Sequence, residues 1–296
     1  MSLIINHNMM AMNANRNLGT AYSALATSVQ RLSSGLRVNS AADDAAGLAI
    51  RELMRAEIAG LNQGVRNAND AISLIQTADG ALQIIDEKLI RMKELAEQAA
   101  TGSYNSDQRL MIESEYQQMA SEITRIANAT DFNGLKLLDG SLSADFHNGT
   151  ELKSVGKLKV HFGTGNDSAE DYYYIKINEA TSSALGLGNS SNIADAGYTV
   201  STQDAAQRSL VAINDAIISK DKIRAHLGAL QNRLENTISN LQIQAENVQA
   251  AESRISDVDV ASEMTNFVRN QILTQAAVAM LGQANSLPQM AMQLIG

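Results

Sequence analysis

The residues whose types could support catalysis or metal binding are few and scattered. The four histidines, His7, His147, His161 and His226, show no His-x-x-x-His spacing and no regularly placed carboxylate. A metal site needs several ligands at suitable spacing, so we expect these histidines to be structural and expect no metal. The chain has no cysteine, which excludes disulfides, thiolate ligands and a thiol nucleophile.

Two further patterns have simpler structural explanations. The segment 163–168 begins Gly-Thr-Gly but lacks the third glycine and the following helix of a phosphate-binding loop, so it predicts a hairpin turn. Asp43 and Asp44 could form a carboxylate pair for acid–base chemistry. However, Ser40 and Asp43 have the spacing of a capping box, which begins a helix. We therefore expect no enzyme activity and no cofactor.

The elements that must position any functional surface are long aliphatic helices. Apolar residues make up 45% of the chain and aromatic residues only 4%, and Pro288 is the single proline. Almost nothing therefore interrupts a helix before this position. A near-heptad seam marks the first helix at Ala11, Ala14, Leu18, Tyr22, Leu25, Val29, Leu32 and Leu36.

The same spacing predicts a second helix from Asp43 to about Ala100, a shorter helix that returns, a long helix that ends near Ser253, and a last helix from about Val260. Between them, alternating runs at 157–162 and 172–177 predict strands in one or two hairpins. The expected fold is mainly α: a long antiparallel, coiled-coil-like helical rod with a small β-hairpin region and a two-helix terminal domain.

Both ends of the chain lack charge. No Lys, Arg, Asp or Glu occurs in residues 1–15 or in residues 270–296, although apolar residues are frequent there. A helix that faces water normally carries charged residues, so these ends are expected to be buried against other copies of the chain and unfolded in a free monomer. Disordered tails are the alternative. The expected assembly core is Leu18, Tyr22, Leu25, Val29, Leu32, Met264, Phe267, Ile272, Met280 and Leu281.

The charge balance narrows the range of partners. The formal net charge is −9, and no basic cluster offsets it, which disfavours binding to nucleic acid. No window contains the roughly 18 uninterrupted apolar residues of a membrane span, and the first residues have no positive region followed by a cleavage site. We expect neither a membrane partner nor a Sec signal peptide.

Four segments resemble bacterial flagellin. They are the 30–50 segment QRLSSGLRVNSAADDAAGLAI, the 66–82 segment RNANDAISLIQTADGAL, the 131–138 segment DFNGLKLL and the 250–259 segment AAESRISDVD. The similarity covers roughly residues 1–140 and 200–296, and the short middle leaves room only for the hairpin part of the rod domain. The resemblance implies a short flagellin, the structural subunit of the flagellar filament.

The resemblance also implies a domain division and a set of partners. The expected segments are an inner-tube domain (1–34 with 259–296), hinges or spokes (35–45 and 253–258), and a rod domain (46–252) with its β-hairpin region at about 132–200. Flagellins are exported unfolded by the flagellar type III apparatus, with a chaperone on the C-terminal helix, and polymerise outside the cell with cap and hook-associated proteins. Some are recognised by Toll-like receptor 5 (TLR5), and the similar motif here places this contact at Arg91, Leu95 and Glu122.

Two alternatives remain at this point. A hook–filament junction protein shares the terminal helices, although the strength of the 30–50 match favours the filament subunit. A cytoplasmic coiled-coil scaffold or signalling protein would explain the heptads, but it would need charged, solvated ends.

Overall fold

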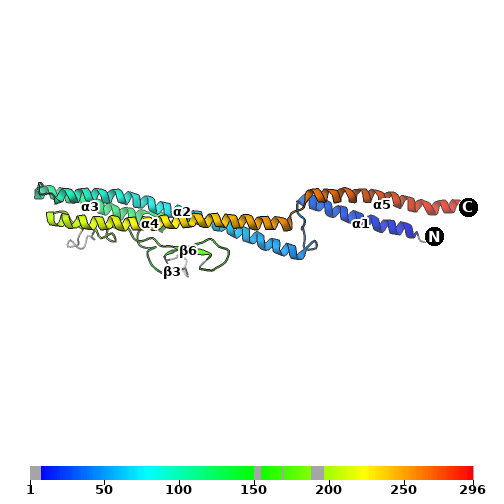
Figure 1. Cartoon of the computed structure of the whole chain (residues 1–296), viewed down its shortest axis with the longest axis horizontal. Coiled ribbons are helices and arrows are strands. Elements are labelled where there is room, and N and C mark those ends of the chain that lie inside the picture. The colour runs from blue at the N-terminus through cyan, green and yellow to red at the C-terminus, as the bar shows by residue number, and fades with distance from the viewer. Residues whose placement is uncertain (1–7, 150–154, 169, 188–196, 296) are drawn as a thin grey trace. The chain divides into compact units, whose positions relative to one another are not determined.

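The computed structural model describes residues 8–149, 155–168, 170–187 and 197–295, and most of them are helical (Figure 1). The helices of these residues are α1 (Met9–Ser34), α2 (Ala45–Ala100), α3 (Ser106–Ala129), α4 (Gln203–Ser256) and α5 (Val260–Ile295). The chain forms two compact units: a terminal unit, residues 1–58 with 246–296, and a central unit, residues 59–245. The predicted mainly α fold is confirmed.

The terminal unit pairs the first helix with the last. The Asn8 side-chain amide donates to the Ala284 carbonyl at 2.8 Å, and the Arg31 guanidinium lies 3.8 Å from the Glu263 carboxylate. Because low numbers on α1 meet high numbers on α5, the two helices are antiparallel. Figure 1 shows them side by side.

The chain segments that leave α1 and enter α5 are joined by backbone hydrogen bonds. Leu36 and Asp257 form an antiparallel bridge, and the Val258 amide donates to the Gly35 carbonyl at 3.0 Å. Gly35 ends α1 with φ +74°, a left-handed conformation that a residue with a Cβ adopts only with strain. The helix end and the bridge therefore depend on this glycine.

The central unit packs α3, the C-terminal part of α2 (residues 59–100) and the N-terminal part of α4 (residues 203–245) around one apolar core. Along α2 the side chains of Leu82, Ile85, Leu89 and Met92 are fully buried. Ala78 keeps the heptad seam continuous, because it is also fully buried. This continuous core explains why the seam predicted the helices correctly.

Ion pairs fix α2 against α4 in the central unit. The buried Lys220 ammonium lies 2.5 Å from the Asp86 carboxylate and 2.8 Å from that of Asp221. One turn further along α4, the Arg224 guanidinium donates to both oxygens of Asp79, at 2.7 and 3.2 Å. Residue numbers rise along α2, from 79 to 86, as they fall along α4, from 224 to 220, so the two helices are antiparallel.

The strands of the described residues form three two-stranded antiparallel pairs. The strands are β1 (Asp131–Phe132), β2 (Leu135–Lys136), β3 (His147–Asn148), β4 (Val155–Gly156), β5 (Leu158–His161) and β6 (Tyr172–Ile175). The β5–β6 pair confirms the two strands predicted from alternation, with Leu158 opposite Ile175 and His161 opposite Tyr172. Its Val160 and Ile175 side chains join the core of the central unit.

One predicted helix start is displaced. Ser40 does not cap α2; instead Asp44 accepts a hydrogen bond from the Gly47 amide at 2.8 Å, so the helix begins later. The capping pattern therefore indicated the neighbourhood of this start but not the capping residue. The cap of α4 is Thr202, whose hydroxyl accepts from the Ala205 amide at 3.2 Å.

Within the described part of the chain, none of the helices has the length and hydropathy needed to cross a membrane.

Candidate assembly interface

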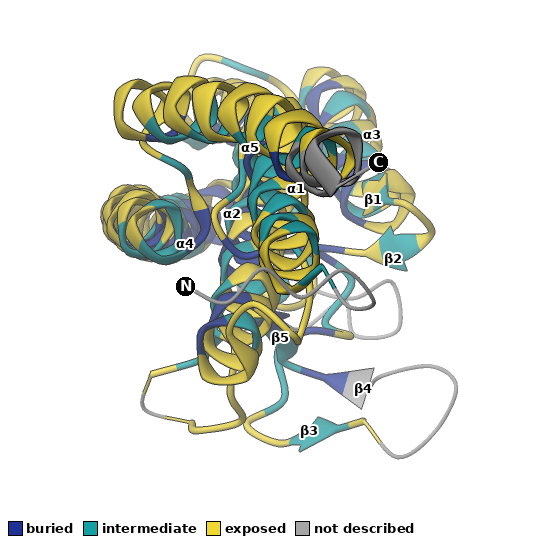
Figure 2. Ribbon diagram, turned by 90° about the vertical axis from the view of Figure 1, so that its right-hand side faces the viewer, coloured by how far each residue is buried: buried dark blue, intermediate teal, exposed yellow. Residues whose placement is uncertain are grey.

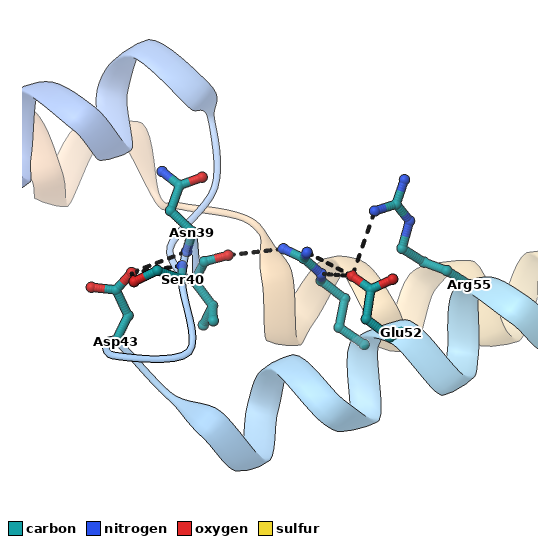
Figure 3. A network of polar contacts seen from close by, with 7 residues as sticks. Asn39, Ser40, Asp43, Glu52 and Arg55 are labelled. Atoms are coloured by element: carbon teal, nitrogen blue, oxygen red, sulfur yellow. Dashed lines mark hydrogen bonds and ion pairs between the residues drawn. The ribbon is translucent and has the colours of Figure 1, made fainter.

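The two adjacent aspartates have structural partners. The Asp43 carboxylate accepts hydrogen bonds from the Asn39 amide, at 3.2 Å, and from the amide and hydroxyl of Ser40, both at 3.0 Å (Figure 3). The backbone hydrogen bond from Ser40 is the largest cause that lowers the pKa of Asp43 below its ordinary value. Asp44 is the cap of α2 described above. The pair therefore shapes the hinge between α1 and α2.

The glycine-containing turn holds a carboxylate of its own chain. The Asp171 side chain accepts from the Gly165 amide at 3.2 Å and from the Asp167 amide at 2.7 Å. A Cβ on Gly163 would lie 1.8 Å from the same carboxylate. The turn joins β5 to β6, as predicted, and Asp171 occupies the position that an external anion would need.

The described histidines are distributed over β3, β5 and α4. The His147 ring lies 5.5 Å from that of Tyr174, and the His161 ring lies 6.0 Å from that of Tyr172. His226 is on α4, and His7 lies outside the described residues. Among the residues that the structure describes, no three His, Asp or Glu side chains are grouped as a metal site.

The α1–α5 pair meets along two heptad seams that contain many small and polar residues. The less exposed positions of α1 include the series Ala11, Ala14, Leu18, Ala21, Leu25, Ser28 and Leu32, with Ala24, Thr27 and Arg31 beside it. Those of α5 include the series Glu263, Phe267, Asn270, Thr274, Ala277, Leu281 and Ala284, with Asn266 and Ser286 beside it. Steps of three and four along both series give each helix one continuous stripe toward its partner.

Small side chains let the two helices approach each other. Ser28 and Ala284 are buried, at 3% and 6% exposure, whereas the seam leucines remain partly exposed. Glu263 is also buried, and its only ion pair among the described residues is the one with Arg31. A seam of this composition buries little apolar area, so the pair gains little stability from its own packing.

The large apolar residues of the terminal unit lie mostly outside this seam. Tyr22 is 63% exposed, Ile272 is 59% and Met280 is 61%. Figure 2 shows most of α5 in the colour of exposed residues. Others of this kind are Met9, Met10, Met12, Val29, Val260, Met264, Val268, Leu273, Val278 and Met290. So many exposed apolar side chains on two helices mark a surface that a partner covers.

A groove runs along one side of the pair. It has a volume of about 630 Å³, and its walls include Ala14, Ala21 and Ala24 of α1 with Leu273, Ala277 and Met280 of α5. Alanines make the groove open enough to accept side chains from a neighbouring helix. The exposed methionine suits such a contact, because its side chain adapts to irregular partners.

The hinge beside the pair is held by polar contacts. The buried Arg51 donates to the Val38 carbonyl at 2.9 Å and to the Glu52 carboxylate at 2.7 Å. Arg55 lies 3.8 Å from the same carboxylate, a contact drawn as a dashed line in Figure 3. The hydrogen bond from Arg51 is the largest cause that lowers the pKa of Glu52. These contacts link the start of α2 to the segment that follows α1.

The ten predicted assembly residues divide into two groups. Leu18, Leu25, Leu32, Phe267 and Leu281 lie in the α1–α5 seam, whereas Tyr22, Val29, Met264, Ile272 and Met280 are exposed. The stripe of α1 that meets α5 therefore runs through Ala21 and Ser28, while Tyr22 and Val29 of the predicted seam stay exposed and remain predicted contacts with other copies. The small size of Ala21 and Ser28 was the available signal, since a close helix contact favours small residues.

The three predicted receptor residues do not form one surface cluster. Arg91 is exposed, but it donates to Glu115 at 2.7 Å and to Glu94 at 2.9 Å, while Glu122 pairs with Arg125 at 2.7 Å. Leu95 is only 1% exposed, because it packs in the core of the central unit, so it offers no surface to a partner. The glutamate of α3 that contacts Arg91 is Glu115, and the sequence alone did not indicate this contact.

Comparison with known proteins places these features in a family. Residues 5–143 match the family model of the bacterial flagellin N-terminal helical region, and residues 210–295 match that of the C-terminal helical region. The chain is 43% identical over 293 residues to a flagellin of Halalkalibacterium halodurans, a match that covers 99% of this chain and 100% of that protein. It is 41% identical over 307 residues to a flagellin of Bacillus subtilis, covering 98% and 99% of the two chains.

The solved structures give a similar result for the fold. A putative flagellar hook-associated protein from Vibrio parahaemolyticus aligns with a TM-score of 0.55 at 18% identity, covering 73% of this chain and 100% of that one. This likeness concerns the fold alone. A Bacillus cereus flagellin crystal structure aligns at 30% identity with a TM-score of 0.47, covering 63% and 94%.

Proposed function

Because the chain belongs to the bacterial flagellin family, and is thus a structural subunit of the flagellar filament, we propose that its terminal unit is completed by neighbouring subunits during polymerisation. The observation that carries this proposal is that many large apolar side chains of α1 and α5 are exposed, while the seam between the helices combines a few leucines and Phe267 with small and polar residues. Contact with other copies would remove this surface from water and stabilise the polymer.

The proposal assigns roles to segments of the chain. Residues 1–34 and 259–296 would form the inner tube, residues 35–45 and 253–258 the spokes, and residues 46–252 the rod domain. The bridge between Leu36 and Asp257 supports the assignment of the spokes, since it ties the two connecting segments together. Full-length identity with flagellins favours the filament subunit over a hook–filament junction protein, and the family does not support a cytoplasmic scaffold.

The same family membership supports a secreted, non-enzymatic subunit. We propose export through the flagellar type III apparatus, with a chaperone on α5 before export, and contact with the cap and hook-associated proteins afterwards. The uncharged, apolar C-terminal segment suits a chaperone that shields it until assembly. No catalytic role is proposed for the aspartates or histidines, because their described contacts are structural.

Recognition by TLR5 is proposed at the exposed face of α2 and α3. Arg91 and Glu122 lie on that face in ion pairs that a receptor contact would have to replace, whereas Leu95 would act only by holding the turn of α2 that carries Arg91. The test is Arg91→Ala in a receptor reporter assay, with Arg208→Ala, which removes an exposed arginine of α4 paired with Asp204, as the matched control. We expect loss of signalling for the first variant alone; equal signalling by both would contradict the proposal.

The assembly proposal is tested by a charge on the exposed surface. Ile272→Asp should leave the monomer as stable as the parent chain, because the side chain is 59% exposed, but it should prevent filaments. Ile272→Val keeps the apolar character and should assemble. Electron microscopy and sedimentation measure both variants, and normal filaments from Ile272→Asp would refute the proposal.

A further inference from the structure

The β5–β6 hairpin has two chemically different faces. Its inner side chains, Val160, Tyr173 and Ile175, pack against the core of the central unit. The opposite face follows from alternation along each strand, and it carries Lys157, Lys159 and His161 with Tyr172 and Tyr174. All five outer residues are partly exposed.

Cationic and aromatic side chains alternate on this outer face. The Lys159 ammonium lies 3.6 Å from the centroid of the Tyr172 ring, and the Lys157 ammonium lies 4.4 Å from that of Tyr174. The two tyrosine rings meet edge to face at 5.4 Å, and the His161 ring stacks on Tyr172. Cation–π contacts of this length hold the lysines over the rings.

The two lysines keep their charge available. Within the described residues, neither ammonium lies within ion-pair distance of a carboxylate. The nearby Asp145 carboxylate accepts a hydrogen bond from Lys176 at 2.5 Å, which is the main cause that lowers the pKa of Asp145. The charge of Lys157 lowers the same pKa further. In a chain of net charge −9, this face is a local cationic surface with positions fixed by aromatic rings.

We propose that this outer face binds an anionic polysaccharide, with Lys157 and Lys159 contacting its carboxylate or sulfate groups. The tyrosine hydroxyls and ring edges can contact sugar hydroxyls and C–H groups, whereas the lysines already cover ring faces on which nucleic acid bases would stack. The dense phosphate charge of nucleic acid is also repelled by the net charge of the chain. These features favour a carbohydrate polyanion.

Polymerisation would multiply a weak site. If the chain assembles as proposed above, each subunit contributes one copy of the face, and one polysaccharide chain can engage several copies. This part of the inference rests on the proposed function. Binding by the monomer does not, so the two are measured separately.

The experiment uses the full chain as monomer and as filaments, with heparin as the sulfated probe and dextran as the neutral one. We expect filaments to retain heparin at low salt, to release it as salt rises and to ignore dextran. Lys157→Gln with Lys159→Gln should weaken heparin binding about tenfold in both forms. Lys157→Arg with Lys159→Arg keeps charge and ring contact, and should bind like the parent chain.

The matched control is Lys93→Gln with Lys222→Gln, which removes the same charge elsewhere on the central unit. Equal weakening by this control, or no heparin binding by the parent chain, would overturn the proposal. Single-stranded DNA that competes as well as heparin at equal charge would overturn the assignment to polysaccharide. If the parent chain binds heparin as a monomer but forms no filaments, the result would count against the assembly proposal alone.

Discussion

The terminal and central units are built from similar heptad helices but use their apolar residues in opposite ways. In the central unit Leu82, Ile85 and Leu89 are fully buried, whereas in the terminal unit Tyr22 and Ile272 are 63% and 59% exposed. Three packed helices surround the first set, but two helices with a small-residue seam cannot surround the second. The comparison teaches that heptad spacing predicts a helix without showing which molecule covers its apolar face.

The two units also differ in how they use charged residues. The central unit has a buried lysine with two aspartate partners, while residues 270–296 of the terminal unit carry no charge at all. Charges within one chain can be paired as it folds, but a charge on a subunit contact must be desolvated each time a copy joins. An uncharged surface avoids this cost.

The largest expected effect comes from removing the ends. Deletion of residues 1–15 and 270–296 should abolish filaments, because most of the exposed apolar surface of α1 and α5 is lost. The central unit should keep its thermal transition within a few degrees, since its core is separate. Electron microscopy and circular dichroism test the two statements, and filaments of the truncated chain would invalidate the distinction between the units.

A smaller effect follows from alanine substitutions in the monomer. Leu89→Ala should lower the free energy of unfolding by about 2–5 kcal/mol, because it leaves a cavity in a closed core. Ile272→Ala, at an exposed position, should change it by less than about 0.5 kcal/mol. Urea unfolding of both monomers measures the contrast. Equal losses would mean that the terminal helices already bury Ile272 in the free chain.

The ion pairs of α2 and α4 sharpen the contrast further. Asp86→Ala should destabilise the central unit by about 1–3 kcal/mol, since it leaves the buried Lys220 with Asp221 as its remaining carboxylate. Asp79→Ala should cost less, because Arg224 is partly exposed and can be solvated. Urea unfolding again gives the values. A larger loss for Asp79→Ala would show that burial does not set the order.

The last effect is a pH dependence of the central unit, which is absent near neutral pH and develops only above pH 10. Burial raises the pKa of Tyr116 above its ordinary value of 10.0, and its hydroxyl donates to the Gly197 carbonyl at 2.5 Å. Above pH 10 the unfolded chain releases this proton while the folded chain keeps it. The free energy of unfolding therefore falls as pH rises, by about 1.4 kcal/mol per unit. Tyr116→Phe should show a shallower decline in alkaline unfolding curves; parallel curves would contradict the assignment.

The sequence predicted the elements well because their signals are local. Long apolar periodicity and the scarcity of proline predicted the helices, and alternation at 157–162 and 172–177 predicted the β5–β6 hairpin. Cap positions were less accurate. Ser40 has the spacing of a cap, but Asp43 bonds back to it within a turn, and Asp44 begins α2 instead. Neighbouring polar residues compete for the same backbone amides, and only the folded hinge shows which one succeeds.

By itself, the sequence determined that the chain is helical, that its ends carry no charge and that its motifs resemble flagellin. Only the tertiary structure decided which stripe of α1 meets α5, because series through Tyr22 or through Ala21 both satisfy heptad spacing. It also placed Glu115, rather than Glu122, beside Arg91, since the register between two helices depends on their whole packed length. Periodicity is a property of one segment, whereas facing and register are properties of a pair.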